Sequence, residues 1–302
     1  MISLQTIPGG KPPIVAGTRN AGVVAVDLGG WSSITERTGL PNDLVTCFAE
    51  GIGTGNGVLR WDEISGKMGS DPGGDLPSIY FQSLLPKALP GGRWGLWAAT
   101  LQGLRYHDGR RWTRLGKEEG FPEGSASTLL ESFDAAGKGT LWVGLPRGLA
   151  WLQDGKWHFE IAHEAFPGSA ALALRAAREA DGENSLWVAT RSEGLRRFKG
   201  GKWYACGLAE GLPSLNLTAL QQSADGRGRP WLWVGANDGR LACLALNYPE
   251  TIWAAIAQDK LPGLSDSAVR GQDARTRRRQ PGACRAESAP PADRAAKPQV
   301  CG

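Results

Sequence analysis

Two arginines in equivalent turns are the side chains of this 302-residue chain best placed to bind a ligand. Arg147 follows Leu-Trp-Val-Gly at 141–144, and Arg191 follows Leu-Trp-Val-Ala at 186–189. A guanidinium group is a rigid fork of donors that matches a carboxylate or a sulfate. The two side chains could therefore hold one anionic group together, provided that the fold brings both turns to the same side.

The motif before each arginine recurs at nearly constant spacing. Its tryptophans, Trp97, Trp142, Trp187 and Trp233, lie 45, 45 and 46 residues apart. Short apolar runs and Gly- or Asp-rich turns surround each copy, and degenerate copies lie upstream at 14–18 and 51–54. Such units predict four short strands each and no helix. The chain is therefore expected to be all-β, a β-propeller of four-stranded antiparallel blades, with about five to six blades.

The same pattern predicts a role for the tryptophans and for the turns. We call each copy of the Leu-Trp motif a Trp box. The tryptophan of each box is expected to be a structural anchor buried between adjacent blades. Because antiparallel strands alternate in direction, the turns after the Trp boxes should line one rim, together with the starts of the first strands. The turns contribute the ligand-binding candidates Arg19, Asn20, Asn56, Gln102, Arg147, Arg191, Glu193, Asn237 and Asp238. The strand starts add Asn42, Asp43, Ser125, Ser169, Ser214 and Asn216. The alternative interpretation is that these are ordinary solvated turn residues.

The full repeat resembles a known family. Its order is Gly-Leu-Pro, about ten residues of alternating polarity, Asp-x-x-Gly, Leu-Trp-Val-Gly-Thr and then Gly-Leu, over roughly 12–265. This order is similar to the two-component regulator propeller repeat. The resemblance implies a periplasmic or extracytoplasmic sensor module of a bacterial receptor, whose parent protein carries a histidine kinase, hybrid kinase or diguanylate cyclase output. No such output motif is visible in the chain, which suggests a truncated fragment.

Three function classes follow from these observations. The leading interpretation is a non-catalytic, ligand-sensing propeller that binds a small solute or an oligosaccharide. The second is a protein-interaction scaffold, in which a rim or the outer strands bind a partner or form a homodimer. The third is a propeller hydrolase or lyase, which needs convergent carboxylates, a histidine cluster or a metal. The predicted rim offers Asp43, Glu193 and Asp238 on separate blades and no histidine, so no catalytic residue is assigned.

Composition excludes several other classes. Five cysteines and three histidines show no paired or metal-ligand spacing, so we expect no disulfide framework, no metal and no cofactor. No stretch approaches 18 consecutive apolar residues, and the N-terminus lacks a signal-peptide pattern. The formal net charge of +4 is confined to residues 270–302, which hold eight basic and three acidic residues. The remaining body is nearly neutral, which argues against nucleic-acid binding.

Both ends depart from the repeat. Residues 1–13 are expected to supply no innermost strand, so the first unit would be partial, and the sequence leaves open whether the ring closes. The sensor domain is assigned to 1–269. Residues 270–302 contain no Trp, Phe, Tyr, Leu or Ile and are expected to form a disordered basic tail rich in Ala, Arg and Pro. The abrupt change suggests a shifted reading frame, and a natural disordered linker is the alternative.

Overall fold

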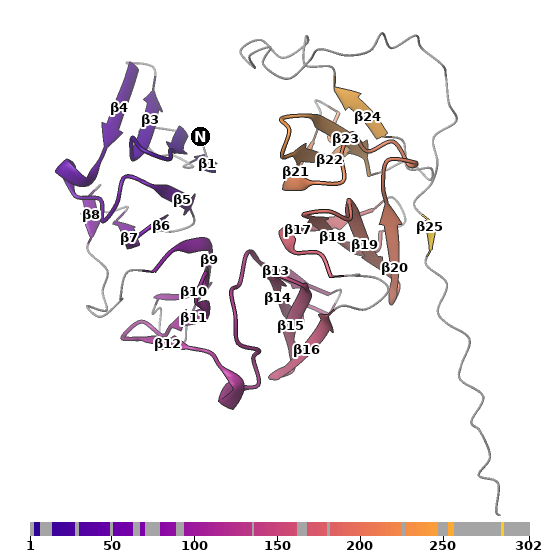
Figure 1. The fold of residues 1–302 in the computed structure, drawn as a ribbon, viewed down its shortest axis with the longest axis horizontal. Helices are drawn as coiled ribbons and strands as arrows, with labels where there is room; N and C mark the ends of the chain where they lie inside the picture. The colour runs from indigo at the N-terminus through magenta and orange to yellow at the C-terminus, as the bar shows by residue number, and fades with distance from the viewer. Residues whose placement is uncertain are drawn as a thin grey trace, which may run out of the picture.

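The computed structural model describes residues 3–6, 14–27, 30–48, 51–62, 67–69, 79–88, 94–134, 136–161, 168–179, 182–224, 227–246, 253–256 and 285–286. These residues form six antiparallel sheets, in each of which strands consecutive in sequence are neighbours. We call the sheets blades 1 to 6. In Figure 1 the blades follow one another along an arc, with the first strand of each blade on its inner side and blades 1 and 6 at the two ends.

The strand bounds show the repeat directly. Blade 1 contains β1 (Ser3–Thr6), β2 (Ile14–Gly17), β3 (Val23–Asp27) and β4 (Gly30–Ile34), and blade 2 contains β5 (Val45–Phe48), β6 (Gly51–Thr54), β7 (Gly57–Asp62) and β8 (Lys67–Gly69). Blade 3 contains β9 (Phe81–Ala88), β10 (Trp94–Thr100), β11 (Gly103–His107) and β12 (Trp112–Arg114). Blade 4 contains β13 (Leu129–Phe133), β14 (Gly139–Leu145), β15 (Gly148–Gln153) and β16 (Lys156–Ile161).

The last two blades continue the pattern. Blade 5 contains β17 (Ala171–Arg178), β18 (Asn184–Thr190), β19 (Leu195–Lys199) and β20 (Lys202–Cys206). Blade 6 contains β21 (Leu217–Ala224), β22 (Pro230–Ala236), β23 (Leu241–Ala245) and β24 (Trp253–Ile256). Two short 3-10 helices, η1 (Glu36–Thr38) and η3 (Lys117–Glu119), lie in the connections between blades.

One expectation about the chain ends needs correction. Residues 3–6 form β1, which pairs with β2 as the innermost strand of blade 1, so the first unit is not partial. In the segment expected to be disordered, β25 (Arg285–Ala286) pairs with the outer edge of β20. The remainder of 270–302 lies outside the described residues. Cys206, next to this pairing, is disulfide-bonded, with a partner outside the described residues, contrary to the expectation from cysteine spacing.

The apolar core lies between blades. Each of the hydrophobic clusters joins two successive sheets; one contains Leu104 of blade 3 and Val143 of blade 4, and another contains Trp187 of blade 5 and Leu232 of blade 6. Cys47 belongs to such a cluster, and burial raises the pKa of its thiol to about 12, so it behaves as a small apolar group.

Hydrogen bonds between equivalent positions reinforce this packing. The side-chain amide of Gln82 in β9 donates to the carbonyl of Ala126 at 2.8 Å, and Ser127 donates to the carbonyl of Ala171 at 2.5 Å. In each case the partners lie one repeat apart, at the start of the innermost strands of neighbouring blades. The first strands are therefore tied to one another as well as to their own sheets.

A buried threonine closes the turn after the Trp box, or after its degenerate copy, in three blades. In blade 3 the Thr100 hydroxyl donates to the Gly103 carbonyl at 2.7 Å and accepts from the backbone amide of Gln102 at 3.2 Å. Equivalent donations join Thr54 to Gly57 and Thr190 to Gly194, and all three threonine side chains are fully buried. The final Thr of the repeat is thus a turn clamp, which fixes where the turn residues point.

Replacing this clamp by its apolar isostere should weaken the fold. In Thr100→Val the Gly103 carbonyl and the Gln102 amide lose a buried partner, which costs about 1–3 kcal/mol of the free energy of unfolding. Thr113→Val, at an exposed position of β12, is the control and should change stability by less than about 0.5 kcal/mol. Urea unfolding of both variants measures the difference. Equal midpoints for the two variants would show that the hydroxyl has no such role.

The box tryptophans differ in how their indole N–H groups are bonded. Trp142 donates to Ser132 at 2.9 Å, and Trp233 donates to Ser223 at 2.8 Å. Each serine lies ten residues before its tryptophan. At the same offset from Trp187 the chain has Ala177, and the buried Trp187 N–H has no acceptor among the described residues.

This difference predicts a stabilising substitution. Ala177→Ser supplies the missing acceptor to Trp187 and should raise the free energy of unfolding by about 1 kcal/mol, whereas Ser132→Ala should lower it by a similar amount. Ala176→Ser adds a hydroxyl on the other face of β17 and is the matched control. Differential scanning calorimetry of the three variants tests this. A lower melting temperature for Ala177→Ser than for the control would contradict the prediction.

Candidate functional site

The turns after the Trp boxes lie beside the starts of the next blade's first strand, as the alternation of strand direction predicts. The Val45 amide donates to the Thr18 carbonyl at 2.9 Å, and the Ala126 amide donates to the Thr100 carbonyl at 2.9 Å. The Gly194 amide likewise donates to the Leu215 carbonyl at 2.9 Å. We call this side the box-turn rim. It consists of the turns between the second and third strands together with the starts of the first strands.

The two arginines singled out by the sequence both lie against the start of β17. The Arg147 guanidinium lies 3.9 Å from the point where a side chain on Gly168 would begin, so glycine leaves room there. The Arg191 amide donates to the Ala170 carbonyl at 3.0 Å. Both arginines are exposed, and neither has an ion-pair partner within the described part of the chain.

Two hydroxyl groups lie at the same place. The oxygens of Ser169 and Ser192 are 3.0 Å apart, and the Ser192 amide donates to Ser169 at 3.1 Å. Ser169 is buried, whereas Ser192, which directly follows Arg191, is exposed. The Arg147 guanidinium, the backbone of Arg191 and a hydroxyl pair thus lie at the start of β17. Guanidinium and hydroxyl donors are groups that can bind a carboxylate or sulfate.

The predicted rim carboxylates have partners of their own. Glu193 lies 3.5 Å from Arg196, and Asp238 accepts from Arg240 in its own turn. The hydrogen bonds from Arg240 lower the pKa of Asp238. Asp43 accepts from the backbone amide of Glu36 at 2.7 Å. The three carboxylates belong to three blades and serve local structure, and no cluster of potential metal ligands occurs among the residues described.

The other rim candidates are dispersed. Exposed turns on four different blades carry Arg19, Asn56, Gln102 and Asn237. The backbone amides of Asn56 and Gln102 donate to the threonines that clamp their turns. The backbone amide of Asn237 donates to the backbone carbonyl of Asn216. Of the predicted set, Arg147 and Arg191 are therefore the pair that the structure brings to one strand start.

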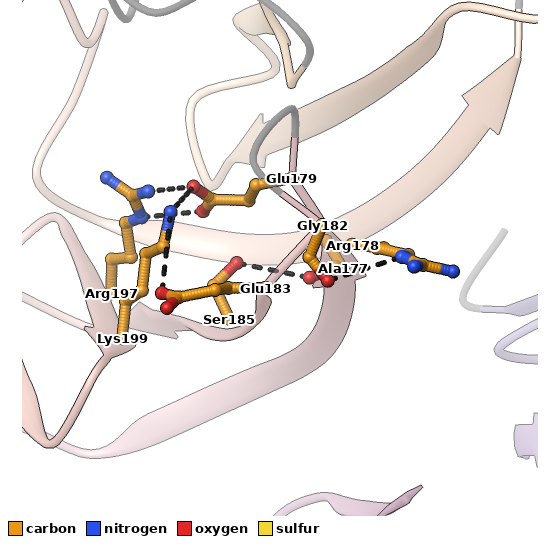
Figure 2. A network of polar contacts seen from close by, with 8 residues as sticks. All are labelled: Ala177, Arg178, Glu179, Gly182, Glu183, Ser185, Arg197 and Lys199. Atoms are coloured by element: carbon orange, nitrogen blue, oxygen red, sulfur yellow. Dashed lines mark hydrogen bonds and ion pairs between the residues drawn. The ribbon is translucent and has the colours of Figure 1, made fainter. Parts of the chain in front are cut away.

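A second polar group lies at the opposite end of β17, where the sequence suggested nothing. Figure 2 shows Glu179 facing Arg197 and Lys199 of β19. Its carboxylate accepts from Arg197 through both oxygens, and from Lys199 at 2.9 Å. Only 9% of the Glu179 side chain is exposed, against 16% for Arg197 and 14% for Lys199. Glu183, which lies 4.0 Å from Lys199, is well exposed.

Aromatic rings hold Arg197 in position. Its guanidinium carbon lies 5.3 Å from the ring centre of Trp187 and 5.6 Å from that of Tyr204. Burial lowers the pKa of Arg197, yet the guanidinium stays charged at neutral pH. Arg197 is directly opposite both Trp187 and Tyr204 in the sheet, and this cross-strand register is the signal by which sequence reasoning could have found the contact.

Comparison with known proteins supports the fold. No family model matches the chain, and no curated protein matches it in sequence. The extracellular domain of a candidate hybrid two component system from B. thetaiotaomicron is 19% identical, with a TM-score of 0.57, over 80% of this chain and 31% of that one. A second such domain from the same organism is 18% identical, with a TM-score of 0.58, over 82% and 34%. The chain is a β-propeller.

These matches show the fold alone and assign no activity to the chain. The chain spans about a third of the length of the two extracellular domains. A candidate 6-phosphogluconolactonase from Bacteroides fragilis also matches, at 14% identity and a TM-score of 0.47, over 84% of this chain and 82% of that one. That similarity is too distant to bear on catalysis. In the described residues, no helix is long and apolar enough to cross a membrane.

Removing the Glu179 charge should destabilise blade 5. In Glu179→Gln, Arg197 and Lys199 lose the carboxylate that compensates their burial, so the free energy of unfolding should fall by about 3 kcal/mol. Asp154→Asn is a matched control because it removes an exposed carboxylate from a pair with Lys138. That pair is worth less than about 1 kcal/mol. Guanidinium chloride unfolding compares the two. A smaller loss in Glu179→Gln than in Asp154→Asn would refute the structural role of Glu179.

Proposed function

We propose that this propeller is a non-catalytic, ligand-sensing module that binds an anionic solute or acidic oligosaccharide at its box-turn rim. One observation carries the proposal: Arg147 and Arg191, from turns of two adjacent blades, both lie against the start of β17 with no ion-pair partner among the residues described. Arginines that only improve solubility need not meet at one strand start, whereas a shared anion requires them to do so.

The arrangement suits binding rather than catalysis. The rim provides donors, namely two guanidinium groups and the Ser169–Ser192 pair, whereas the carboxylates that an acid–base mechanism needs are paired elsewhere. A propeller is also a rigid scaffold, since loops joined to packed strands keep their positions. These features support recognition of a solute without chemical change.

The cellular setting follows from the same proposal. The repeat resembles the two-component regulator propeller repeat, and the fold matches extracellular domains of two component systems. We therefore place the module outside the cytoplasm, as the input part of a receptor whose kinase or cyclase output belongs to a longer parent protein. Ligand binding at the rim would then be the first step of signalling.

Isothermal titration of the full chain tests the proposal. The titrants are uronic-acid and sulfated oligosaccharides, with neutral oligosaccharides of equal length for comparison. We expect acidic members alone to bind, with affinity falling as salt is raised. Arg147→Gln and Arg191→Gln should each weaken binding about 10- to 100-fold, the value of one hydrogen bond to a charged group.

The control is Arg110→Gln, an exposed arginine in the turn between β11 and β12, away from the box-turn rim. It should bind as the wild type does. Equal loss in Arg110→Gln would mean that net charge, and not this site, drives binding. Absence of binding by any acidic oligosaccharide would overturn the proposal.

The scaffold alternative rests on a different observation. Leu101, Leu208 and Leu215 are exposed on loops of the box-turn rim, with 51%, 58% and 37% of their surfaces accessible. Leu208 and Leu215 lie in one connection, between β20 and β21, and clustered exposed leucines favour contact with a protein surface. Under this alternative, Leu208→Ser together with Leu215→Ser would abolish a self-association seen by analytical ultracentrifugation, while Arg147→Gln would leave it unchanged.

A further inference from the structure

A groove lies between blades 5 and 6, on the face opposite the box-turn rim. Its walls come from the ends of the two innermost strands, with Arg175, Arg178 and Glu179 on one side and Gln222, Ser223 and Pro230 on the other. Its volume is about 580 Å³, within the range of small-molecule sites. Because β17 and β21 pack against each other along the arc, both walls belong to rigid elements.

The groove has an excess of positive charge. Glu179, the acidic group in its wall, is already matched by Arg197 and Lys199, as Figure 2 shows. Its carboxylate therefore does not neutralise Arg175 or Arg178. The two arginines remain as the charges that a bound molecule would meet.

Both arginines keep donors available. The Arg178 Nε donates to the Gly182 carbonyl at 3.3 Å, a long bond, and the residue is exposed, so its terminal nitrogens are accessible. The Nε of Arg175 is buried and has no acceptor within the described portion of the chain. A buried donor without a partner costs about 1–3 kcal/mol. Arg175 also lines the groove, so a shift of its side chain would bring this donor to an acceptor bound there and recover that energy.

The facing wall adds neutral polar groups. Gln222 is partly buried and carries an amide that can donate or accept. The Ser223 oxygen accepts from Trp233, which leaves its hydroxyl hydrogen free to donate. Charged donors on one wall and neutral donors on the other fit a molecule with several acceptor oxygens.

We propose that this groove binds a small polyanion, a solute bearing several carboxylate, phosphate or sulfate oxygens, with Arg175 and Arg178 as its charged ligands. The site is separate from the box-turn rim and does not depend on the function proposed there. It lies at the other end of the same strand, β17. Glu179, Arg197 and Lys199 act as positioning residues, because their ion pairs fix the segment that follows Arg178.

Citrate, inorganic phosphate and sulfate are the probes, titrated separately into the full chain and followed by calorimetry and by amide chemical shifts. The three arms distinguish the class of anion. We expect at least one probe to bind and to move the side-chain amide signal of Gln222. Arg178→Gln should weaken that binding about 10-fold or more, as the loss of one charged hydrogen bond implies.

Two further variants separate this site from its surroundings. Arg111→Gln, exposed in the turn before β12, controls for net charge and should bind as the wild type does. Arg147→Gln, on the box-turn rim, should also leave binding intact. If Arg147→Gln weakens it as much as Arg178→Gln, the anion occupies the rim, and the groove proposal fails while the rim proposal gains support.

The role of Arg175 needs a variant that preserves folding. Arg175→Gln removes a partly buried group, so circular dichroism and the melting temperature are recorded first. Arg175→Lys keeps the charge but lacks the guanidinium fork, and it should weaken binding even where Arg175→Gln does not fold. Wild-type affinity in folded Arg178→Gln and Arg175→Lys, or no binding of any probe at millimolar concentration, would overturn the proposal.

Discussion

The burial of apolar strand faces between neighbouring blades is the interaction on which the rest of this molecule depends. A four-stranded sheet cannot cover both of its own faces, and here each apolar cluster joins two consecutive sheets. The repeat then follows from a physical need, since each blade must offer the same apolar surface to the next. Polar residues of the turns are released from packing and are free to vary, so that recognition can evolve on the rims without loss of the core.

Sequence reasoning predicted the features that recur and missed those that occur once. The Trp boxes, their turns and the box-turn rim all follow from a period of about 45 residues, because equivalent strands alternate direction in the same way. By contrast, β1 was missed. Its residues, Ser-Leu-Gln-Thr, lack the apolar pattern of the other first strands, and backbone pairing to β2 holds the segment in the sheet.

The polar network around Glu179 illustrates a second limit. Glu179 and Arg197 lie 18 residues apart. Glu179 directly follows β17, whereas Arg197 lies in β19, and β18 separates these two strands in the sheet. Their contact depends on how far each side chain reaches across the end of blade 5, which no periodicity encodes. The threonine clamp could be predicted only in part. The sequence shows that Thr recurs in the repeat, but the hydrogen bonds of its buried hydroxyl follow from the turn geometry.

One strand, β17, connects the two ends of blade 5. Ser169 precedes it on the box-turn rim and Arg178 ends it at the groove, so that about nine extended residues, or roughly 30 Å, separate the two places. The strand is hydrogen-bonded to β18 and packed against β13 and β21, which leaves it little freedom to deform locally. Thermodynamic linkage then applies. If a solute bound at one end changes the affinity of the other end for its solute by some factor, the second solute changes the affinity of the first end by the same factor. Solutes bound at the two proposed sites would thus stand at opposite ends of a single strand that runs through the blade.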